Sequence, residues 1–415
     1  MYTENKKTSL NIKLALVSIF LIGISNGLFF SGVFSVFVVT LGGDNASLGF
    51  LSSFGGIILI SALAPGGYLV DKINRSYILK LGLIANFVGY LILILSNNMF
   101  GLYISQIFIS LGQGLSSPAL QSLIADSIKT NKRESTYGKL YLVENIGNGI
   151  GPLFAVITFL IIGDNWNLPT LKEVFYVAFI FLIIGIIVQS NMSERHSFGS
   201  ESESNEIKAG TNNKTKRDWS RTWWFVPSFI IVLGFVIAIG AGLSVSYFPI
   251  FFKDVYNQLP ITVNILFFLS AMVTGIVGYI APKFAKLVGK IEAMALLQLF
   301  ATFMFFLIAL IPPFEFVAIF FLMRGAFMNA STPIKNAVVM DLVPKRMRGK
   351  MSSLESLTFS LVFSLSAGIG GVLLDQYNFQ VLFFSTTFLY IVGTLPLLFL
   401  RPFVTVSGKP VELPL

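Results

Sequence analysis

The segment GYLVDKINR, residues 67–75, ends a long apolar stretch, and a related segment ends another apolar stretch in the second half of the chain. The second segment is GYIAPKFAK, residues 278–286, which shares the initial glycine–tyrosine pair and has basic residues at the same offsets. Internal repeats of this size are common in polytopic membrane proteins. The recurrence predicts that the chain consists of two related halves.

Further matches follow these two segments in the same order. In each half a proline stands eight residues before an aspartate, and an arginine stands seven after it: Pro118, Asp126 and Arg133, then Pro333, Asp341 and Arg348. The stretches GKLYLVE (138–144) and GKMSSLE (349–355) then make Glu144 and Glu355 equivalent. Several matched offsets in one order predict two homologous halves.

The composition is that of a membrane protein. Of the 415 residues 54% are hydrophobic and only 12% are charged, with a mean hydropathy of +0.79, whereas soluble proteins carry about 25% charged residues. The chain has no cysteine and a single histidine, His196. The sequence therefore offers no thiolate and no histidine cluster for a metal site or a nucleophile.

Twelve apolar stretches are long enough to cross the ~30 Å hydrocarbon core as helices. They are expected near residues 12–41, 46–70, 76–96, 99–126, 138–163, 173–191, 222–252, 260–282, 290–311, 314–341, 351–374 and 379–400. The polar tract 192–221 divides them into six and six and has the composition of a flexible linker. The expected fold is all-α, with one six-helix bundle in 1–191 and a second in 222–415.

The distribution of basic residues predicts the topology. With the N-terminus inside, the outside segments hold only Lys172 and Lys253, and the spans hold only Arg324 and Lys335. All other Lys and Arg fall in inside segments, which by the positive-inside rule places both termini in the cytoplasm. The net charge of +9 is therefore a topology signal rather than a nucleic-acid footprint. We expect a monomeric multi-pass protein of the cell membrane, with the lipid bilayer and a small molecule as its partners.

Two sets of six helices, a long central loop and GGYLVDKINRSY between the second and third spans resemble the major facilitator superfamily. The family's loop motif has the form G-x-x-x-D-[RK]-x-G-R-[KR]. Asn74 and Ser76 depart from it, and four residues fit it: Gly67, Asp71, Lys72 and Arg75. The resemblance implies two pseudo-symmetric six-helix bundles around a central cavity, and transport by alternating access.

The stretch LVENIGNGIGP, residues 142–152, resembles a second motif of that family, found in the fifth helix of exporters and drug:proton antiporters. Gly138, Gly147, Gly151 and Pro152 fit this motif, whereas Ala155 and Val156 stand where it has glycines. Small residues on one helix face also let another helix approach closely, and a proline can bend a helix. Close packing therefore explains the glycines without any substrate.

The resemblance also implies a cluster of charges at the cytoplasmic ends. Asp71 is expected to approach the start of the eleventh helix, and Arg75 is expected to pair with Asp126. Such a cluster would hold the cytoplasmic side closed in the outward-facing state, whereas plain topology and a tight turn are the alternative. The second half carries a degenerate copy, with Pro282 in place of the acid but with Asp341 retained.

Charged residues inside spans each need a partner or a task, because insertion costs at least ~2.5 kcal/mol. Arg324, Ser331 and Lys335 share one face of the tenth helix and are candidate cavity residues, as is Asn26 in the first. Arg324 either binds an anionic or polar group of a substrate or bonds to neighbouring helices. Lys335 either reaches toward the cytoplasm or pairs with a carboxylate.

Glu144 and its equivalent Glu355 are the acids that lie clearly within spans. Three roles stay open for Glu144: a cytoplasmic gate residue, a proton carrier, or a packing and capping residue near a helix N-terminus, where the helix dipole favours the ionised carboxylate. The sequence calls for no cofactor, and coupling to protons is the only ion coupling it suggests.

Two transport functions follow from these residues. The motif in the fifth helix favours an exporter of a small amphipathic molecule, working against protons. Arg324 and Lys335 favour an uptake symporter or facilitator for a small organic anion, as does a first helix with Ser25 and Asn26 instead of an acid. A fourth helix without the arginine that members of the family often carry counts against a standard drug:proton antiporter. A non-transporting receptor or assembly partner is a third alternative. No nucleophile–base set or phosphate loop supports an enzyme, because GNGIG lies inside a span and follows no strand.

Overall fold

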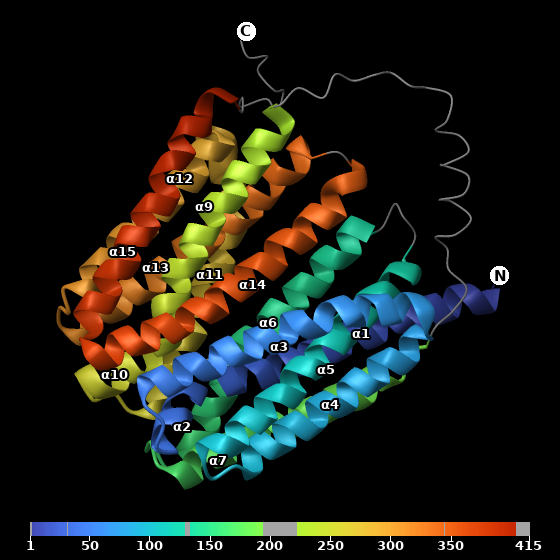
Figure 1. The fold of residues 1–415 in the computed structure, drawn as a ribbon, viewed down its shortest axis with the longest axis horizontal. Helices are drawn as coiled ribbons and strands as arrows, with labels where there is room; N and C mark the ends of the chain where they lie inside the picture. The colour runs from blue at the N-terminus through green and yellow to red at the C-terminus, as the bar shows by residue number, and fades with distance from the viewer. Residues whose placement is uncertain (1, 31, 129–132, 194–221, 344, 404–415) are drawn as a thin grey trace. The chain divides into compact units, whose positions relative to one another are not determined.

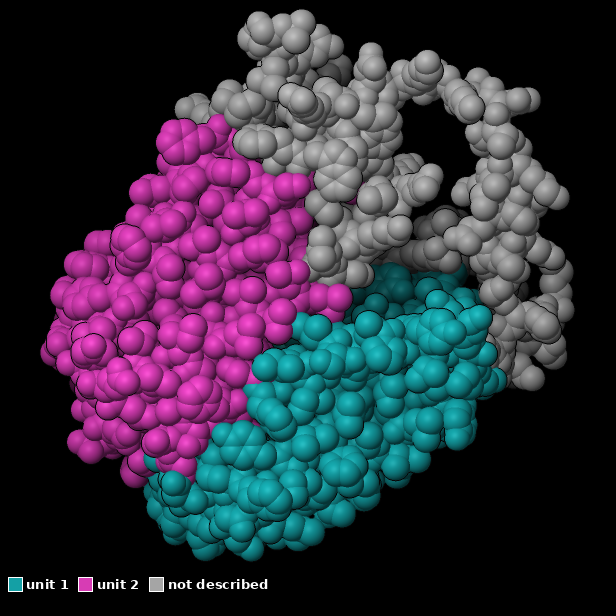
Figure 2. Space-filling model, viewed as in Figure 1, with its two compact units in different colours: residues 1–42, 54–217 teal, residues 43–53, 218–415 magenta. Residues whose placement is uncertain are grey.

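The computed structural model describes residues 2–30, 32–128, 133–193, 222–343 and 345–403, and every regular element within these ranges is a helix (Figure 1). The chain divides into two compact units, one of residues 1–42 and 54–217 and the other of residues 43–53 and 218–415 (Figure 2). Most of the expected linker, 192–221, lies outside the described residues.

The described residues of the first half of the chain form seven helices. They are α1 (Tyr2–Phe30), α2 (Phe34–Thr40), α3 (Asn45–Lys72), α4 (Arg75–Leu95), α5 (Met99–Asp126), α6 (Arg133–Ile162) and α7 (Leu168–Ser190). The second half forms α9 (Thr222–Ser244), the 3-10 helix η3 (Val245–Tyr247), α10 (Phe248–Tyr256), α11 (Pro260–Val288), α12 (Lys290–Ala309), α13 (Phe314–Leu342), α14 (Lys345–Gln376), α15 (Phe379–Thr394) and the 3-10 helix η4 (Leu395–Phe403).

Eleven helical segments of the described chain are long and apolar enough to cross a membrane. The expected twelfth, residues 99–126, is the 28-residue helix α5. It falls outside the eleven because serines and glutamines recur along its length and lower its hydropathy. The all-α membrane fold is confirmed, and the expected spans match the observed helices closely.

The first expected span of each half is broken. The span at 12–41 consists of α1, which ends at Phe30, and α2, which begins at Phe34. The span at 222–252 consists of α9, the 3-10 turn η3 and α10. Pro249 in the first turn of α10 lacks the N–H that a continuous helix would use. The break therefore occurs at the equivalent place in both halves.

Helix pairing also repeats between the halves. In the first unit α1 packs against α6 and α7, while α4 packs against α5 and α7. In the second unit α9 packs against α14 and α15, while α12 packs against α13 and α15. These are the same pairs in the same order, which supports the internal repeat that the sequence predicted.

Glycines form the seam between α1 and α6. A β-carbon added to Gly151 would lie 2.6 Å from the Cα of Gly27, and one added to Gly27 would lie 2.3 Å from the carbonyl oxygen of Asn148. Gly23 and Gly147 are almost as close, and only glycine fits where two backbones touch. The α9–α14 pair repeats this arrangement, since a β-carbon on Gly242 would lie 2.3 Å from the carbonyl oxygen of Phe363.

The start of α3 belongs to the second unit. Asp375 of α14 accepts the backbone N–H groups of Asn45 at 3.2 Å and Ala46 at 2.7 Å, and the side-chain amide of Asn45 at 2.8 Å. Asp44 accepts the N–H of Ser47 at 2.7 Å. Bonds from the hydroxyl and N–H of Ser47 hold the pKa of Asp44 below its usual range. Two carboxylates thus satisfy the free N–H groups at this helix start.

Candidate functional site

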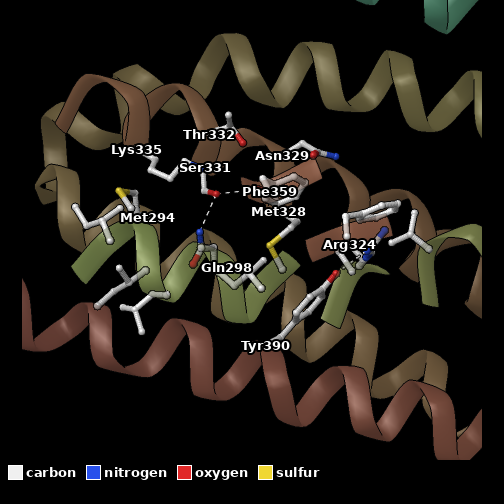
Figure 3. A pocket seen from close by; sticks show the side chains of 18 residues that line it. Met294, Gln298, Arg324, Met328, Asn329, Ser331, Thr332, Lys335, Phe359 and Tyr390 are labelled. Carbon is white, nitrogen blue, oxygen red and sulfur yellow. Dashed lines mark hydrogen bonds between the residues drawn. The ribbon is translucent and has the colours of Figure 1, made fainter. Parts of the chain in front are cut away.

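The second unit contains a cavity of about 240 Å³. Its walls come from α9, α12, α13, α14 and α15 (Figure 3). Most of the lining is apolar or aromatic, including Met294, Met328, Phe359 and Phe363. The charged and polar groups of the lining lie mainly on α13. An apolar cavity with a few placed polar groups is the usual form of a small-molecule site.

Arg324 lies at one end of this cavity and is 7% exposed. Its Nη2 donates to the hydroxyl of Tyr390 at 2.9 Å (Figure 3). Its guanidinium lies 5.1 Å from the ring centre of Phe305 and 5.6 Å from that of Phe248. Aromatic faces stabilise a cation. The Arg324 charge is thus held among three rings.

The guanidinium of Arg324 is only partly satisfied. Within the described part of the chain, its buried Nε has no hydrogen-bond partner and no carboxylate forms an ion pair with it. A buried cation without an anion is costly. Of the two expectations for Arg324, the structure shows the bond to a neighbouring helix, whereas binding of a substrate group stays a prediction for a residue that also lines a cavity.

Ser331 lines the middle of the cavity, and its hydroxyl is already engaged. It accepts the side-chain N–H of Gln298 at 3.0 Å and donates to the carbonyl of Met328 at 2.7 Å (Figure 3). The Oε1 of Gln298 accepts the hydroxyl of Thr394 at 3.3 Å. This chain of bonds ties α12, α13 and α15 together, and it fixes Gln298 in the wall.

Lys335 lies at the other end of the cavity from Arg324 (Figure 3). Its ammonium forms an ion pair with Glu355 of α14, and the two side chains are 18% and 15% exposed. Of the two expectations for Lys335, the structure places it with a carboxylate. Glu355 thus forms an ion pair with a cation. Glu144, its equivalent in the first unit, has a different environment.

Glu144 lies on an exposed turn of α6 in the first unit. The described side chains include no hydrogen-bond or ion-pair partner for its carboxylate. The backbone carbonyl of Glu144 lies against Gly23 in the α1–α6 seam. Gly138 faces open space, and α6 continues through Pro152 to Ile162. Of the predicted glycine motif on α6, only Gly147 and Gly151 therefore lie in the seam.

The loop between α3 and α4 brings together two of the predicted gate residues. Arg75 forms an ion pair with Asp126 at the end of α5, with side chains 27% and 21% exposed. Asn74 has φ −54° and accepts the N–H of Tyr77, so it caps α4 where the family motif has a glycine. Asp71 is exposed. Asp341 and the first residues of α14 have no described side chains, and the contact expected for Asp71 therefore lies outside the described residues.

Asn26 accepts a hydrogen bond from Tyr90 of α4 at 3.3 Å, within the first unit. It does not line the cavity beside Arg324. The aromatic partners of Arg324, which are Phe248, Phe305 and Tyr390, were not predicted from the sequence, and neither was Gln298. A chain with 42 phenylalanines gives no signal for which rings surround a charge, whereas a glutamine inside an apolar span could have been noticed.

These features are those of a polytopic helical membrane transporter fold with a small-molecule cavity. The sequence profile of the Major Facilitator Superfamily matches residues 15–320 and 293–414. The chain belongs to this superfamily, and it is an integral multi-pass membrane protein.

Curated relatives match part of the chain. The quinolone resistance protein NorA of Staphylococcus aureus (strain N315) is 27% identical over 135 residues, which cover 32% of this chain and 34% of NorA. An uncharacterized transporter of Buchnera aphidicola subsp. Schizaphis graminum is 26% identical over 164 residues, which cover 38% of this chain and 40% of that protein. The matches therefore span well under half the length of these relatives.

Solved structures match nearly the whole chain. A mutant of the nucleoside transporter NupG aligns with a TM-score of 0.71 at 14% identity, covering 94% of this chain and 99% of that one. A bacterial homologue of the iron transporter ferroportin gives 0.71 at 15% identity, covering 94% and 98%. A POT family transporter in complex with 5-aminolevulinic acid gives 0.69 at 16%, covering 96% of each chain. At these identities the similarity shows the fold alone.

Proposed function

We propose that this chain is a secondary transporter that exports a small amphipathic molecule with an apolar, aromatic body and one anionic group. The observation that carries the proposal is Arg324. It is a buried cation at a cavity wall, with one hydrogen bond to Tyr390 and no ion-pair partner among the described carboxylates. A bound anion would complete its hydrogen bonds and neutralise its charge.

The rest of the cavity suits the body of such a ligand. Met294, Met328, Phe359 and Phe363 supply an apolar lining, and methionine and aromatic side chains bind varied ring systems well. A cavity of about 240 Å³ favours a molecule of one or two rings. The unpaired charge of the lining is positive, which disfavours a lipophilic cation.

Export is supported by two arguments. NorA, a partial relative, is named for quinolone resistance. In addition, an inside-negative membrane potential drives an anion outward by about 2.3 kcal/mol per charge for each 100 mV. We propose that the protein lies in the cell membrane with both termini in the cytoplasm, as its basic residues favour. Glu144 stays a candidate gate residue or proton carrier.

Uptake of an organic anion is the second candidate. The observation that favours it is the ion pair of Lys335 and Glu355 beside the cavity. Proton binding to such a carboxylate would free a cation for an anion, which is the sign expected for symport. Cells that express the protein should retain less 2-naphthoate than control cells if it exports, and more if it takes the anion up.

The binding experiment uses the purified protein and two probes, 2-naphthoate and tetraphenylphosphonium. We expect the wild type to bind naphthoate and the Arg324→Ala variant to bind it about tenfold to hundredfold more weakly. Glu315→Ala, an exposed acid on the same helix, is the matched control and should bind as the wild type does. Binding of tetraphenylphosphonium alone, or unchanged naphthoate affinity in Arg324→Ala, would overturn the proposal.

A further inference from the structure

The middle of the cavity wall carries an uncharged amide that two other side chains hold in place. Gln298 of α12 is 4% exposed and lines the cavity. Its Nε2 donates to the hydroxyl of Ser331 at 3.0 Å (Figure 3), and its Oε1 accepts the hydroxyl of Thr394 at 3.3 Å. Thr394 is fully buried and is not part of the cavity lining. The amide is thus fixed both at its nitrogen and at its oxygen.

This amide keeps hydrogen-bonding capacity after its internal bonds are made. An amide nitrogen has two N–H groups, whereas an amide oxygen and a hydroxyl oxygen each have two acceptor sites. The bonds to Ser331 and Thr394 use one N–H and one acceptor site of Gln298. Ser331 donates its own O–H to Met328 and keeps one acceptor site. A ligand hydroxyl matches what is left, because it can accept from the free N–H and donate to a free acceptor site.

We propose that Gln298 is a specificity-determining residue of the cavity, and that it binds an uncharged hydroxyl group at the end of the substrate opposite the anionic group. The substrate class is then a hydroxylated aromatic acid. The inference rests on the anionic, aromatic substrate class of the proposed function and adds a second polar end to the molecule. Ser331 completes the hydroxyl site, and Thr394 holds the amide from outside the cavity.

The spacing of the two polar groups sets the length of the substrate. On α13, Ser331 lies seven residues after Arg324, and on α15, Thr394 lies four residues after Tyr390, which is bonded to Arg324. These separations correspond to about 10 Å and about 6 Å of helix. Long helical side chains lean toward the helix N-terminus, which carries the Arg324 guanidinium further away. Two fused rings, with a hydrogen bond of about 3 Å at each end, fit such a distance.

A structural role for Gln298 is the competing explanation, because its bonds also connect α12, α13 and α15. The two explanations differ in what they predict. A residue that only connects helices affects stability and changes the affinity of all ligands alike. A specificity-determining residue changes the relative affinity of two ligands that differ in a single hydroxyl group. The relative affinity therefore separates the two roles.

The test uses the full-length purified protein in lipid nanodiscs and three acids, which are 2-naphthoate, 6-hydroxy-2-naphthoate and 6-methyl-2-naphthoate. The carboxylate and the 6-substituent lie at opposite ends of the two rings. Hydroxyl and methyl groups are similar in size, so their comparison isolates hydrogen bonding from the space that the group fills. Affinities are measured by calorimetry at about pH 7, where the carboxylates are ionised. We expect the wild type to bind the hydroxy acid about fivefold to tenfold more tightly than the methyl acid.

A variant assigns this preference to the amide. Gln298→Met keeps the length of the side chain and removes both hydrogen-bonding atoms, so the hydroxy and methyl acids should then bind about equally. Gln376→Met, which changes an exposed glutamine at the end of α14, is the matched control and should keep the wild-type preference. The comparison of acids in the wild type stands even if Gln298→Met fails to fold.

The possible results separate this inference from the proposed function. A wild type that binds 2-naphthoate through Arg324 without preferring the hydroxy acid would overturn the inference and leave the proposed function standing. A preference that persists in folded Gln298→Met would also overturn it, because another group would then bind the hydroxyl. If the wild type bound none of the three acids, the proposed function and the inference would both fail.

Discussion

The carboxylate of Asp375, near the end of α14, accepts the backbone N–H of Ala46 at 2.7 Å in the first turn of α3. The N–H groups of a first helical turn have no partner within their own helix. Asp375 therefore caps a helix that lies more than three hundred residues earlier in the sequence. Tyr247 adds to the same place, because its hydroxyl donates to the carbonyl of Ala367 at 2.6 Å, next to the glycines that bring α3 and α14 together.

Replacement of Asp375 by alanine should lower the stability of the folded protein, because three hydrogen bonds to Asn45 and Ala46 are lost. Loss of a helix cap costs about 1 kcal/mol, and the exposed carboxylate places the effect at the low end of the range. Thermal unfolding should show a fall of about 1–2 °C. The control is Asp254→Ala, whose acid pairs with the adjacent Lys253, and an equal fall in both variants would remove the cap as the explanation.

Two glycines of α6 should differ sharply in their tolerance to alanine. A methyl group on Gly151 would lie 2.6 Å from the backbone of Gly27, whereas one on Gly138 would meet nothing within 4 Å. Gly151→Ala should therefore destabilise the protein by about 1–3 kcal/mol, and Gly138→Ala should be neutral or slightly stabilising. Expression level and thermal unfolding of the two variants measure this difference. Equal behaviour would mean that the seam can open to admit a methyl group.

The ion pair of Arg75 and Asp126 should show a measurable but modest coupling. Both side chains are about a quarter exposed, so the interaction is screened and worth up to about 1 kcal/mol. A double-mutant cycle with Arg75→Ala and Asp126→Ala, followed by thermal unfolding, gives the coupling energy. The exchanged variant Arg75→Asp/Asp126→Arg should recover part of the loss. If the losses of stability in the two single variants simply add in the double variant, the ion pair has no measurable coupling energy.

Tyr390→Phe tests how Arg324 is held. The variant keeps the ring against the guanidinium but removes the hydroxyl that accepts from Nη2. Arg324 would then depend more on a bound anion for its hydrogen bonds, although its position would be less fixed. We expect a change in 2-naphthoate affinity of about threefold to tenfold with little change in thermal stability. Tyr377→Phe, which changes an exposed tyrosine immediately after α14, is the matched control.

The helical architecture could be predicted from the sequence because lipid imposes it. Apolar length and basic loops identify spans without reference to tertiary contacts, and matched offsets such as those of Glu144 and Glu355 revealed the repeat. Helix bounds were missed where local chemistry intervenes. Pro249 and the 3-10 turn before it break the seventh span. The bounds expected for α5, in contrast, match the observed helix, although its serines and glutamines place it outside the apolar set.

The site was harder to predict, because helical periodicity places residues on one side of a helix but does not show which residues of other helices they contact. The stripe of Arg324, Ser331 and Lys335 was expected on one side of a helix, and all three line the cavity. The pairing of Lys335 with Glu355 depends on how α13 and α14 pack, which no spacing encodes. The glycines of α6 were given a packing explanation in advance, yet only the structure shows that Gly138 does not share it.

The break in the first long helix of each half also bears on the history of the chain. Both α1 and α9 stop short and continue as a separate short helix at the equivalent place, although the residues at the two breaks differ. The simplest descent is that one ancestral six-helix bundle already carried this interruption before its gene doubled. The loop charges diverged afterwards, since Pro282 now stands where the first half has Asp71. In this descent, the helix break is older than the difference in loop charges between the two halves.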